Sequence, residues 1–210
     1  MIRILIADDH VVVREGLRQI IAKAPDMTVV AEAANGREAL QMALAQESDV
    51  VILDISMPEM SGLEVLKQIR NENVRLQILV LSVYAEEAYA VRSLRAGASG
   101  YLTKDSSPDQ LLTAIRKVSL GGKYVSPSLA ERLACEMETD SAREPHQKLS
   151  DREFQVLRLL SSGKSVKEIA KELSLRPPSV STYRARILAK MKMKHVAELT
   201  HYAIRNRLAD

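Results

Sequence analysis

The stretch Val-Val-Ile-Leu-Asp at residues 50–54 decides the fold class, because four apolar residues run directly into a carboxylate. A short apolar run of this kind predicts a strand that is buried on both faces of a parallel sheet. An unpartnered charge at the end of a buried strand costs free energy. Asp54 therefore indicates that some other group at the end of this strand balances its charge.

Outward from this strand, short runs with β-branched residues alternate with amphipathic stretches through residues 1–122. Five strands that alternate with helices predict an α/β domain, a doubly wound parallel sheet with helices on both faces. The last helix of this part, near Pro108–Leu120, stops at Gly121-Gly122. The five predicted strands are Ile2–Ala7, Thr28–Ala31, Val50–Asp54, Gln77–Ser82 and Gly100–Thr103.

Polar side chains stand at the carboxyl ends of these strands, which open onto one edge of a doubly wound sheet, where ligands bind. Asp8, Asp9 and Asp54 would repel one another there unless a cation joined them, and their oxygens suit Mg²⁺. The Ser82 hydroxyl and the Lys104 ammonium would hold phosphoryl oxygens while a carboxylate attacks phosphorus. Each of these residues alone also has another interpretation. The Asp pair would cap the following helix, the serine would be a turn residue, and the lysine would be a solvated charge. Their occurrence at successive strand ends favours one shared site.

Over about residues 1–120 the sequence resembles the receiver domain of two-component response regulators, which has a flavodoxin-like fold. The residues that carry the resemblance are Asp8-Asp9, Asp54, Met57-Pro58, Gly62, Ser82 and Gly97 through Lys104. The resemblance implies that Asp54 is the phosphoacceptor and that a histidine kinase supplies the phosphoryl group. The Mg²⁺ ligands that it implies are Asp8, Asp9, Asp54 and the backbone carbonyl of Ser56.

The resemblance also implies a phosphoryl-binding and switch set. Lys104 pairs with the phosphoryl group, Ser82 moves to bond it, and Tyr101 lies at the aromatic switch position. Packing within a half-buried strand is the alternative interpretation of Tyr101. Many receivers have proline after the lysine, whereas this chain has Asp105, and this leaves the geometry of the local loop open.

Charge divides the chain into three parts. Residues 1–122 carry 13 Lys and Arg against 16 Asp and Glu, a net charge of −3, and residues 123–147 carry a net charge of −2. Residues 148–210 carry 14 against 6, a net charge of +8, which indicates a polyanionic partner. We therefore expect a phosphoacceptor receiver domain at 1–122, a linker at 123–147 with a short helix at Pro127–Met137, and a helix-turn-helix domain at 148–210.

The basic part predicts four short helices, at about 151–161, 166–173, 177–191 and 196–207. The second and third have helix-turn-helix spacing. In the third, Val180, Tyr183, Ile187 and Met191 form an apolar stripe, and the opposite side carries short hydroxyl side chains and arginines suited to base edges and phosphates. The predicted DNA-binding residues are Ser179, Ser181, Thr182, Arg184, Ala185, Arg186 and Lys190.

This part resembles the LuxR-type helix-turn-helix of the NarL/FixJ regulators. The resemblance rests on Leu149 through Glu153, Val156-Leu157, Gly163 through Ser165, Glu168 through Ala170, Leu173, Val180, Tyr183-Arg184 and Ile187 through Met191. It implies that 177–191 is the recognition helix and that the last helix serves dimerisation. The family often caps the recognition helix with Ser or Thr, but Arg176 precedes Pro177-Pro178 in this chain, so a side-chain acceptor is missing.

Two enzyme classes fail on particular residues. A haloacid-dehalogenase phosphatase needs a second aspartate where this chain has Ser56, and a P-loop needs glycine where it has Arg158. We expect a transcription regulator and not an enzyme. It should work in the cytoplasm and form a dimer when phosphorylated or on double-stranded DNA. We expect no membrane partner, since no apolar run reaches the roughly 18 residues needed to span a bilayer. The open alternative is a phosphorelay or protein-interaction module whose basic tail binds a protein or RNA. Cys135 is a passive thiol in this interpretation.

Overall fold

The computed structural model describes residues 1–45, 48–72, 76–83, 86–127, 129–131, 144–206 and 208. The chain forms two compact units, Met1–Ala134 and Cys135–Asp210, and each is described by itself. Of the helix expected at Pro127–Met137, residues 127 and 129–131 are helical. The rest of that helix, with Cys135, lies outside the described residues.

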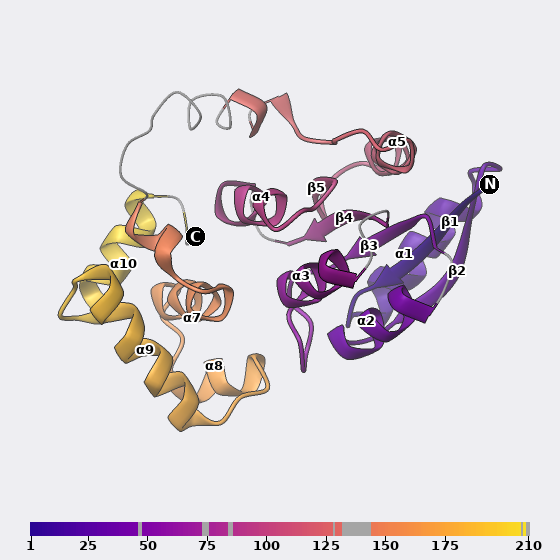
Figure 1. Cartoon of the computed structure of the whole chain (residues 1–210). Helices are drawn as coiled ribbons and strands as arrows, with labels where there is room; N and C mark the ends of the chain where they lie inside the picture. Colours follow the sequence, from indigo (N-terminus) through magenta and orange to yellow (C-terminus); the bar gives the residue numbers. More distant parts are fainter. Residues whose placement is uncertain are drawn as a thin grey trace. The chain divides into compact units, whose positions relative to one another are not determined.

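The first unit contains a five-stranded parallel sheet of order β2-β1-β3-β4-β5, which confirms the predicted doubly wound α/β fold (Figure 1). The second strand is longer than expected, and β3 ends one residue before Asp54. The Asp54 N–H nevertheless donates to the carbonyl of Ala7 at 2.8 Å, so Asp54 remains tied to the neighbouring strand. The strands are β1 Ile2–Ala7, β2 Met27–Ala33, β3 Val50–Leu53, β4 Gln77–Ser82 and β5 Gly100–Thr103.

Helices cover both faces of this sheet because successive strand residues point to opposite faces. One face packs against α1 and α5, and its buried side chains include Ile6, Ile52 and Leu81. The other face is covered by α2, α3 and α4 (Figure 1). The helices of the unit are α1 Val11–Ala22, α2 Gly36–Ala45, α3 Gly62–Glu72, α4 Glu86–Arg95 and α5 Pro108–Ser119.

The second unit is helical, and its α7 and α8 begin at the two capping boxes that the sequence contains. The side chains of Ser150 and Ser165 accept from the backbone of the residue three positions on, and Glu153 and Glu168 accept from the backbone of the serines. Its elements are η1 Pro145–Lys148, α7 Asp151–Ser161, α8 Val166–Glu172, α9 Pro177–Met191 and α10 Val196–Arg205. The four expected helices are thus present, with α8 and α10 slightly shorter than expected.

The 3₁₀ helix η1 begins in the expected linker but packs in the second unit. His146 Nδ1 lies 2.9 Å from the hydroxyl of Tyr202, and that hydroxyl donates to the carboxylate of Glu144 at 3.0 Å. The His146 ring also lies 6.0 Å from the ring of Phe154. The chain is therefore attached to α7 and α10 before the first capping box begins. No helix in the described part of the chain is long and apolar enough to cross a membrane.

Candidate functional site

The strand ends of the first unit bring two carboxylates and an ammonium together. Asp8 follows β1, Asp54 follows β3, and Lys104 follows β5 with its N–H donating to the carbonyl of Ser82 at 2.8 Å. The Lys104 Nζ lies 2.6 Å from Asp8 Oδ2 and 3.1 Å from Asp54 Oδ2. Three residues that are far apart in the sequence thus form one ion-paired cluster.

Burial and neighbouring charges set the protonation of Asp54 and Lys104. Asp54 is only 2% exposed, and its burial raises the pKa to about 6, although Lys104 and the backbone amide of Ser56 favour the ionised form. Burial opposes the charge of Lys104, but the charge of Asp54 and the hydrogen bond to Asp8 outweigh it and raise the pKa of the ammonium. Lys104 therefore stays cationic beside a carboxylate that is ionised at neutral pH.

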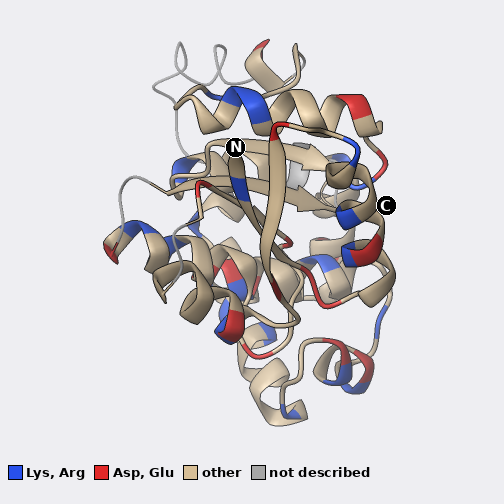
Figure 2. Cartoon of the chain, turned by 90° about the vertical axis from the view of Figure 1, so that its right-hand side faces the viewer, with Lys and Arg blue, Asp and Glu red and all other residues tan. Residues whose placement is uncertain are grey.

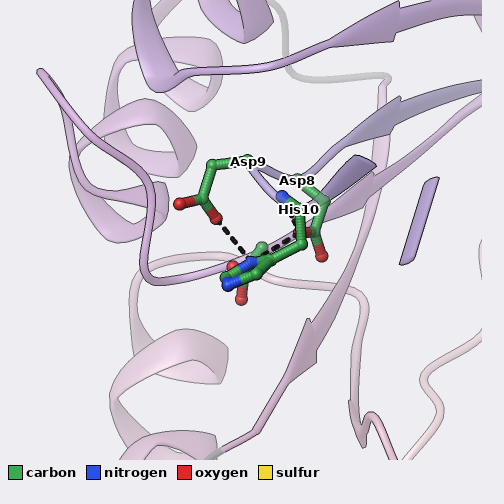
Figure 3. A group of neighbouring side chains, drawn as sticks. Asp8, Asp9 and His10 are labelled. Carbon is green, nitrogen blue, oxygen red and sulfur yellow. Dashed lines mark hydrogen bonds and ion pairs between the residues drawn. The ribbon is translucent and has the colours of Figure 1, made fainter. Parts of the chain in front are cut away.

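A third carboxylate and a histidine extend the cluster (Figure 3). Asp8, Asp9, His10 and Asp54 each offer a ligand atom within 4.8 Å of the others. The His10 Nδ1 lies 2.9 Å from Asp9 Oδ1 and 3.3 Å from Asp8 Oδ1. The three aspartates were predicted from the sequence but His10 was not, because its only signal was its place directly after the acidic pair. The three carboxylates fit the oxygen ligands that Mg²⁺ prefers.

Ser56, whose carbonyl is the fourth expected metal ligand, lies half-buried in the loop between β3 and α3. Gly62 holds this loop close to the end of the strand, since its N–H donates to the carbonyl of Ile55 at 2.9 Å. A Cβ added to Gly62 would lie 2.0 Å from the carbonyl oxygen of Asp54, so no larger residue fits without moving the backbone there. The loop geometry around Asp54 therefore depends on a glycine at position 62.

The predicted switch residues are both buried. Ser82 is fully buried at the end of β4 and pairs with Thr103 of β5. Tyr101 is also fully buried and pairs with Val80. The loop geometry left open at Asp105 is a turn, in which the N–H of Ser106 donates to the carbonyl of Thr103 at 3.0 Å. This turn forms without proline and presents Lys104 to the carboxylates.

The raised pKa of Asp54 predicts a stability effect. The folded chain binds this proton more tightly than the unfolded chain, so the contribution is fully present below pH 3.8 and is lost as the pH rises through about 6. Above that pH the ionised carboxylate costs the folded state on the order of 3 kcal/mol. We expect Asp54→Asn to raise the free energy of unfolding by about this amount at pH 8, and by little near pH 4, as urea unfolding without divalent ions would measure. The exposed Asp105→Asn should show no such gain, and an equal gain in both variants would contradict this origin.

In the second unit, α9 presents the predicted DNA-binding residues to solvent. Its buried residues Val180, Ile187 and Met191 face the core, and Tyr183 of the expected apolar stripe is half-buried. Arg176 makes no side-chain cap, as the sequence indicates, and two prolines occupy the first turn. The exposed set comprises Ser181, Thr182, Arg184, Ala185, Arg186 and Lys190, with Ser179 half-buried.

Contacts within the unit already involve three of these side chains. The hydroxyls of Ser181 and Thr182 donate to the carbonyls of Pro177 and Pro178 at 3.2 and 3.0 Å, which leaves their oxygens as acceptors. The Lys190 Nζ lies 2.6 Å from the buried carboxylate of Glu153. Burial opposes the charge of Glu153, but this hydrogen bond and those from Ser150 lower its pKa. Lys190 therefore fixes α9 to α7, a role that its place in the sequence does not reveal.

Comparison with known proteins matches both units. The receiver domain family of response regulators matches residues 4–116, and the luxR family of bacterial regulatory proteins matches residues 147–203. The response regulator UvrY of Escherichia coli O6:H1 is 36% identical over 211 residues, which cover 100% of this chain and 97% of UvrY. The transcriptional regulatory protein UhpA of Salmonella typhimurium is 41% identical over 201 residues, which cover 96% of this chain and 97% of UhpA.

A solved structure extends the likeness to a protein on DNA. RcsB from Salmonella enterica serovar Typhimurium, bound to promoter rprA in the presence of phosphomimetic BeF3-, has a TM-score of 0.66 at 25% identity. The match covers 96% of this chain and 98% of RcsB. An α/β receiver joined to a helix-turn-helix unit defines a two-component regulator of transcription. This chain belongs to the NarL/FixJ family of response regulators, with a receiver domain and a LuxR-type DNA-binding domain.

Proposed function

We propose that phosphorylation of Asp54 by a histidine kinase controls how this regulator binds DNA. The observation that carries the proposal is the Lys104 ammonium, 2.6 Å from Asp8 and 3.1 Å from Asp54 at the ends of β1, β3 and β5. A cation beside a buried carboxylate is the arrangement needed to receive a phosphoryl group. The chain then acts as a switch and not as an enzyme that turns over a separate substrate.

The proposed chemistry uses the ionised form of Asp54. One of its carboxylate oxygens attacks phosphorus, the new O–P bond forms, and the P–N bond to the kinase histidine breaks with the electron pair left on the imidazole. Asp54 Oδ1 makes no hydrogen bond among the described residues, so no donor competes for the electron pair that would attack phosphorus. Lys104 would then pair with a phosphoryl oxygen instead of Asp8.

Mg²⁺ would be held by Asp8, Asp9, Asp54 and the carbonyl of Ser56, and when bound it neutralises charge on the transferred group. The donor set supports this assignment, because ligand atoms of Asp8, Asp9 and Asp54 lie within 4.8 Å of one another and Asp54 Oδ1 is a buried oxygen without a hydrogen bond. Lys104 occupies the other oxygens of Asp8 and Asp54, namely Oδ2 of each. The ammonium and the metal therefore divide the oxygens of the site between them.

We propose that the switch passes through Ser82 and Tyr101. A phosphoryl group adds roughly −1.5 to −2 charges, and the Ser82 hydroxyl at the end of β4 would turn to bond it. Ser82 is fully buried and next to Thr103 in the sheet, so its movement alters the packing around β5, which contains Tyr101. Repacking of this part of the receiver would then change the pairing of receivers or their effect on the DNA-binding unit.

For DNA recognition we propose that α9 enters the major groove. Arg184 and Arg186 are exposed, and none of the described ion pairs involves them, so their positive charge is available to DNA. Ser179 and Ala185 belong to the same helix and would contribute to the same surface. Ser181 and Thr182 act as acceptors, and Lys190 acts mainly by holding α9 against Glu153. Figure 2 shows both signs of charge spread along the ribbon, so the argument for DNA rests on the net charge of +8 at residues 148–210.

We further propose that two chains bind paired half-sites, that the protein works in the cytoplasm with the chromosome, and that the functional division is 1–122, 123–147 and 148–210. The physical argument for dimerisation is that two DNA-binding units joined in one dimer bind more tightly than separate ones. Once the first unit is bound, the effective concentration of the second unit near its half-site is raised. The contacts of η1 with α10 support a linker whose end is fixed to the DNA-binding domain.

The full chain should bind mixed genomic DNA fragments more tightly after treatment with acetyl phosphate and Mg²⁺. We expect an increase of at least about tenfold, because pairing of the chains adds the contacts of a second unit. Gel shift would measure the affinity, and sedimentation would measure the change from monomer to dimer. The Asp54→Asn chain is the matched control and should respond to neither reagent. A treated wild-type chain that binds RNA or protein but not DNA would instead favour the protein-interaction module.

A further inference from the structure

His10 is placed where a ligand of the metal site would stand. It is the residue directly after Asp9, and its Nδ1 lies 2.9 Å from Asp9 Oδ1 and 3.3 Å from Asp8 Oδ1 (Figure 3). Its backbone N–H donates to Asp8 Oδ1 at 2.8 Å, which fixes the main chain beside the acidic pair. The side chain of His10 is 63% exposed, so the imidazole can turn without displacing the core.

The cap position of this histidine does not account for its side chain. It is the N-cap residue of α1, but its side chain makes no cap hydrogen bond to the helix. An octahedral ion about 2.1 Å from each ligand spans ligands that are about 3 to 4 Å apart. The ligand atoms of Asp8, Asp9, His10 and Asp54 all lie within 4.8 Å of one another, so a rotation of the exposed His10 side chain with small shifts of the carboxylates brings all four to one ion.

An imidazole changes which ion such a site prefers. Mg²⁺ takes oxygen ligands and keeps several waters, whereas first-row transition ions accept imidazole nitrogen and generally bind a mixed site more tightly along the series from Mn²⁺ to Cu²⁺. Asp54 Oδ1 is a second, independent sign of a ligand, since it is buried without a hydrogen bond and belongs to a residue only 2% exposed. Three carboxylates with one imidazole form a mixed oxygen and nitrogen set.

We propose that the Nδ1 of His10 is a direct ligand at this site and gives it a preference for divalent first-row transition ions over Mg²⁺. The inference rests on the metal site of the proposed function and adds to it one ligand and the class of ion. His10 is thus a specificity-determining residue, and Asp8, Asp9 and Asp54 supply the binding that all divalent ions share.

The test uses Mn²⁺ alone with the full chain, because its electron spin reports on bound nitrogen. Pulsed electron paramagnetic resonance of the chain labelled with ¹⁵N-histidine should show coupling between Mn²⁺ and a histidine nitrogen, and His10→Asn should remove it. Calorimetric titration should show that His10→Asn lowers the Mn²⁺ affinity by about tenfold or more, the size of effect seen for partners of metal ligands, and leaves the Mg²⁺ affinity unchanged. His201→Asn, a change at another exposed histidine, should alter none of these values.

Two results would overturn the proposal, and they differ in what else they imply. If Asp9→Asn abolishes Mn²⁺ binding but the wild-type chain shows no histidine coupling, the carboxylate metal site stands and His10 is not a ligand. If Mn²⁺ binds equally well to Asp9→Asn, the ion is held elsewhere, and both this proposal and the metal site of the proposed function are wrong.

Discussion

Asp54→Asn is expected to take up no phosphate from acetyl phosphate and Mg²⁺, while the wild-type chain takes up one phosphate per molecule. The physical reason is that the amide lacks the nucleophilic carboxylate oxygen, and no other carboxylate of the cluster has the same surroundings. Both oxygens of Asp8 are engaged, Oδ2 by Lys104 at 2.6 Å and Oδ1 by the N–H of His10, whereas Asp54 Oδ1 accepts no hydrogen bond among the described residues. Intact-mass spectrometry or radiolabelling would measure the incorporation.

Lys104→Ala distinguishes the role of the Lys104 ammonium from that of the phosphoacceptor and the metal ligands. It leaves the three carboxylates in place, so Mg²⁺ affinity should survive, whereas the phosphorylated conformation should be weakened because the ammonium no longer pairs with a phosphoryl oxygen. Asp9→Asn should have the opposite pattern and lose Mg²⁺ affinity. Equal labelling of Asp54→Asn and wild type would show that the phosphoacceptor lies at another residue.

DNA affinity is expected to depend steeply on salt, since the second unit has to displace cations from DNA phosphates. For a dimer with about 6 to 10 phosphate contacts, affinity should fall by about 10³-fold to 10⁵-fold between roughly 50 and 200 mM salt. Arg184→Ala and Arg186→Ala separate two kinds of contact. Loss of a phosphate contact weakens all sequences alike and flattens the salt dependence, whereas loss of a base contact relaxes the preference at one position.

Lys23→Ala is the matched control, because it removes one exposed positive charge from the receiver at the end of α1. It should leave both the affinity and its salt dependence nearly as in the wild type. Binding curves at several salt concentrations, with random and selected DNA sequences, would provide the measurements. If neither arginine variant differs from this control, α9 is not the helix that reads DNA.

The sequence predicted the fold because its signals are local and periodic. Apolar runs such as Val50–Leu53 specify buried strands, and serines such as Ser150 and Ser165 specify helix starts. The site could be predicted to the extent that parallel strands bring their carboxyl ends together, which places Asp8, Asp54 and Lys104 side by side.

Other features depend on distances that no local pattern encodes. The bond between Lys190 and Glu153 joins residues 37 positions apart, and the same charge pattern also fits a solvated lysine. His10 was missed because a histidine next to a helix start can serve many purposes, and its contacts with Asp8 and Asp9 are visible only in the structure. The full burial of Tyr101 likewise depends on packing around the end of the sheet, which strand periodicity alone does not determine.

Under the proposed function, the bridge that Lys104 forms between Asp8 and Asp54 would link phosphorylation and cation binding thermodynamically. In the resting receiver one ammonium serves two carboxylates, so a divalent ion approaching Asp8 meets a charge that is already compensated. Transfer of the ammonium to a phosphoryl oxygen frees Asp8 and raises the local demand for positive charge. The coupling free energy acts equally in both directions. An ion that binds the phosphorylated receiver more tightly must, to the same degree, favour the phosphorylated form over the resting one.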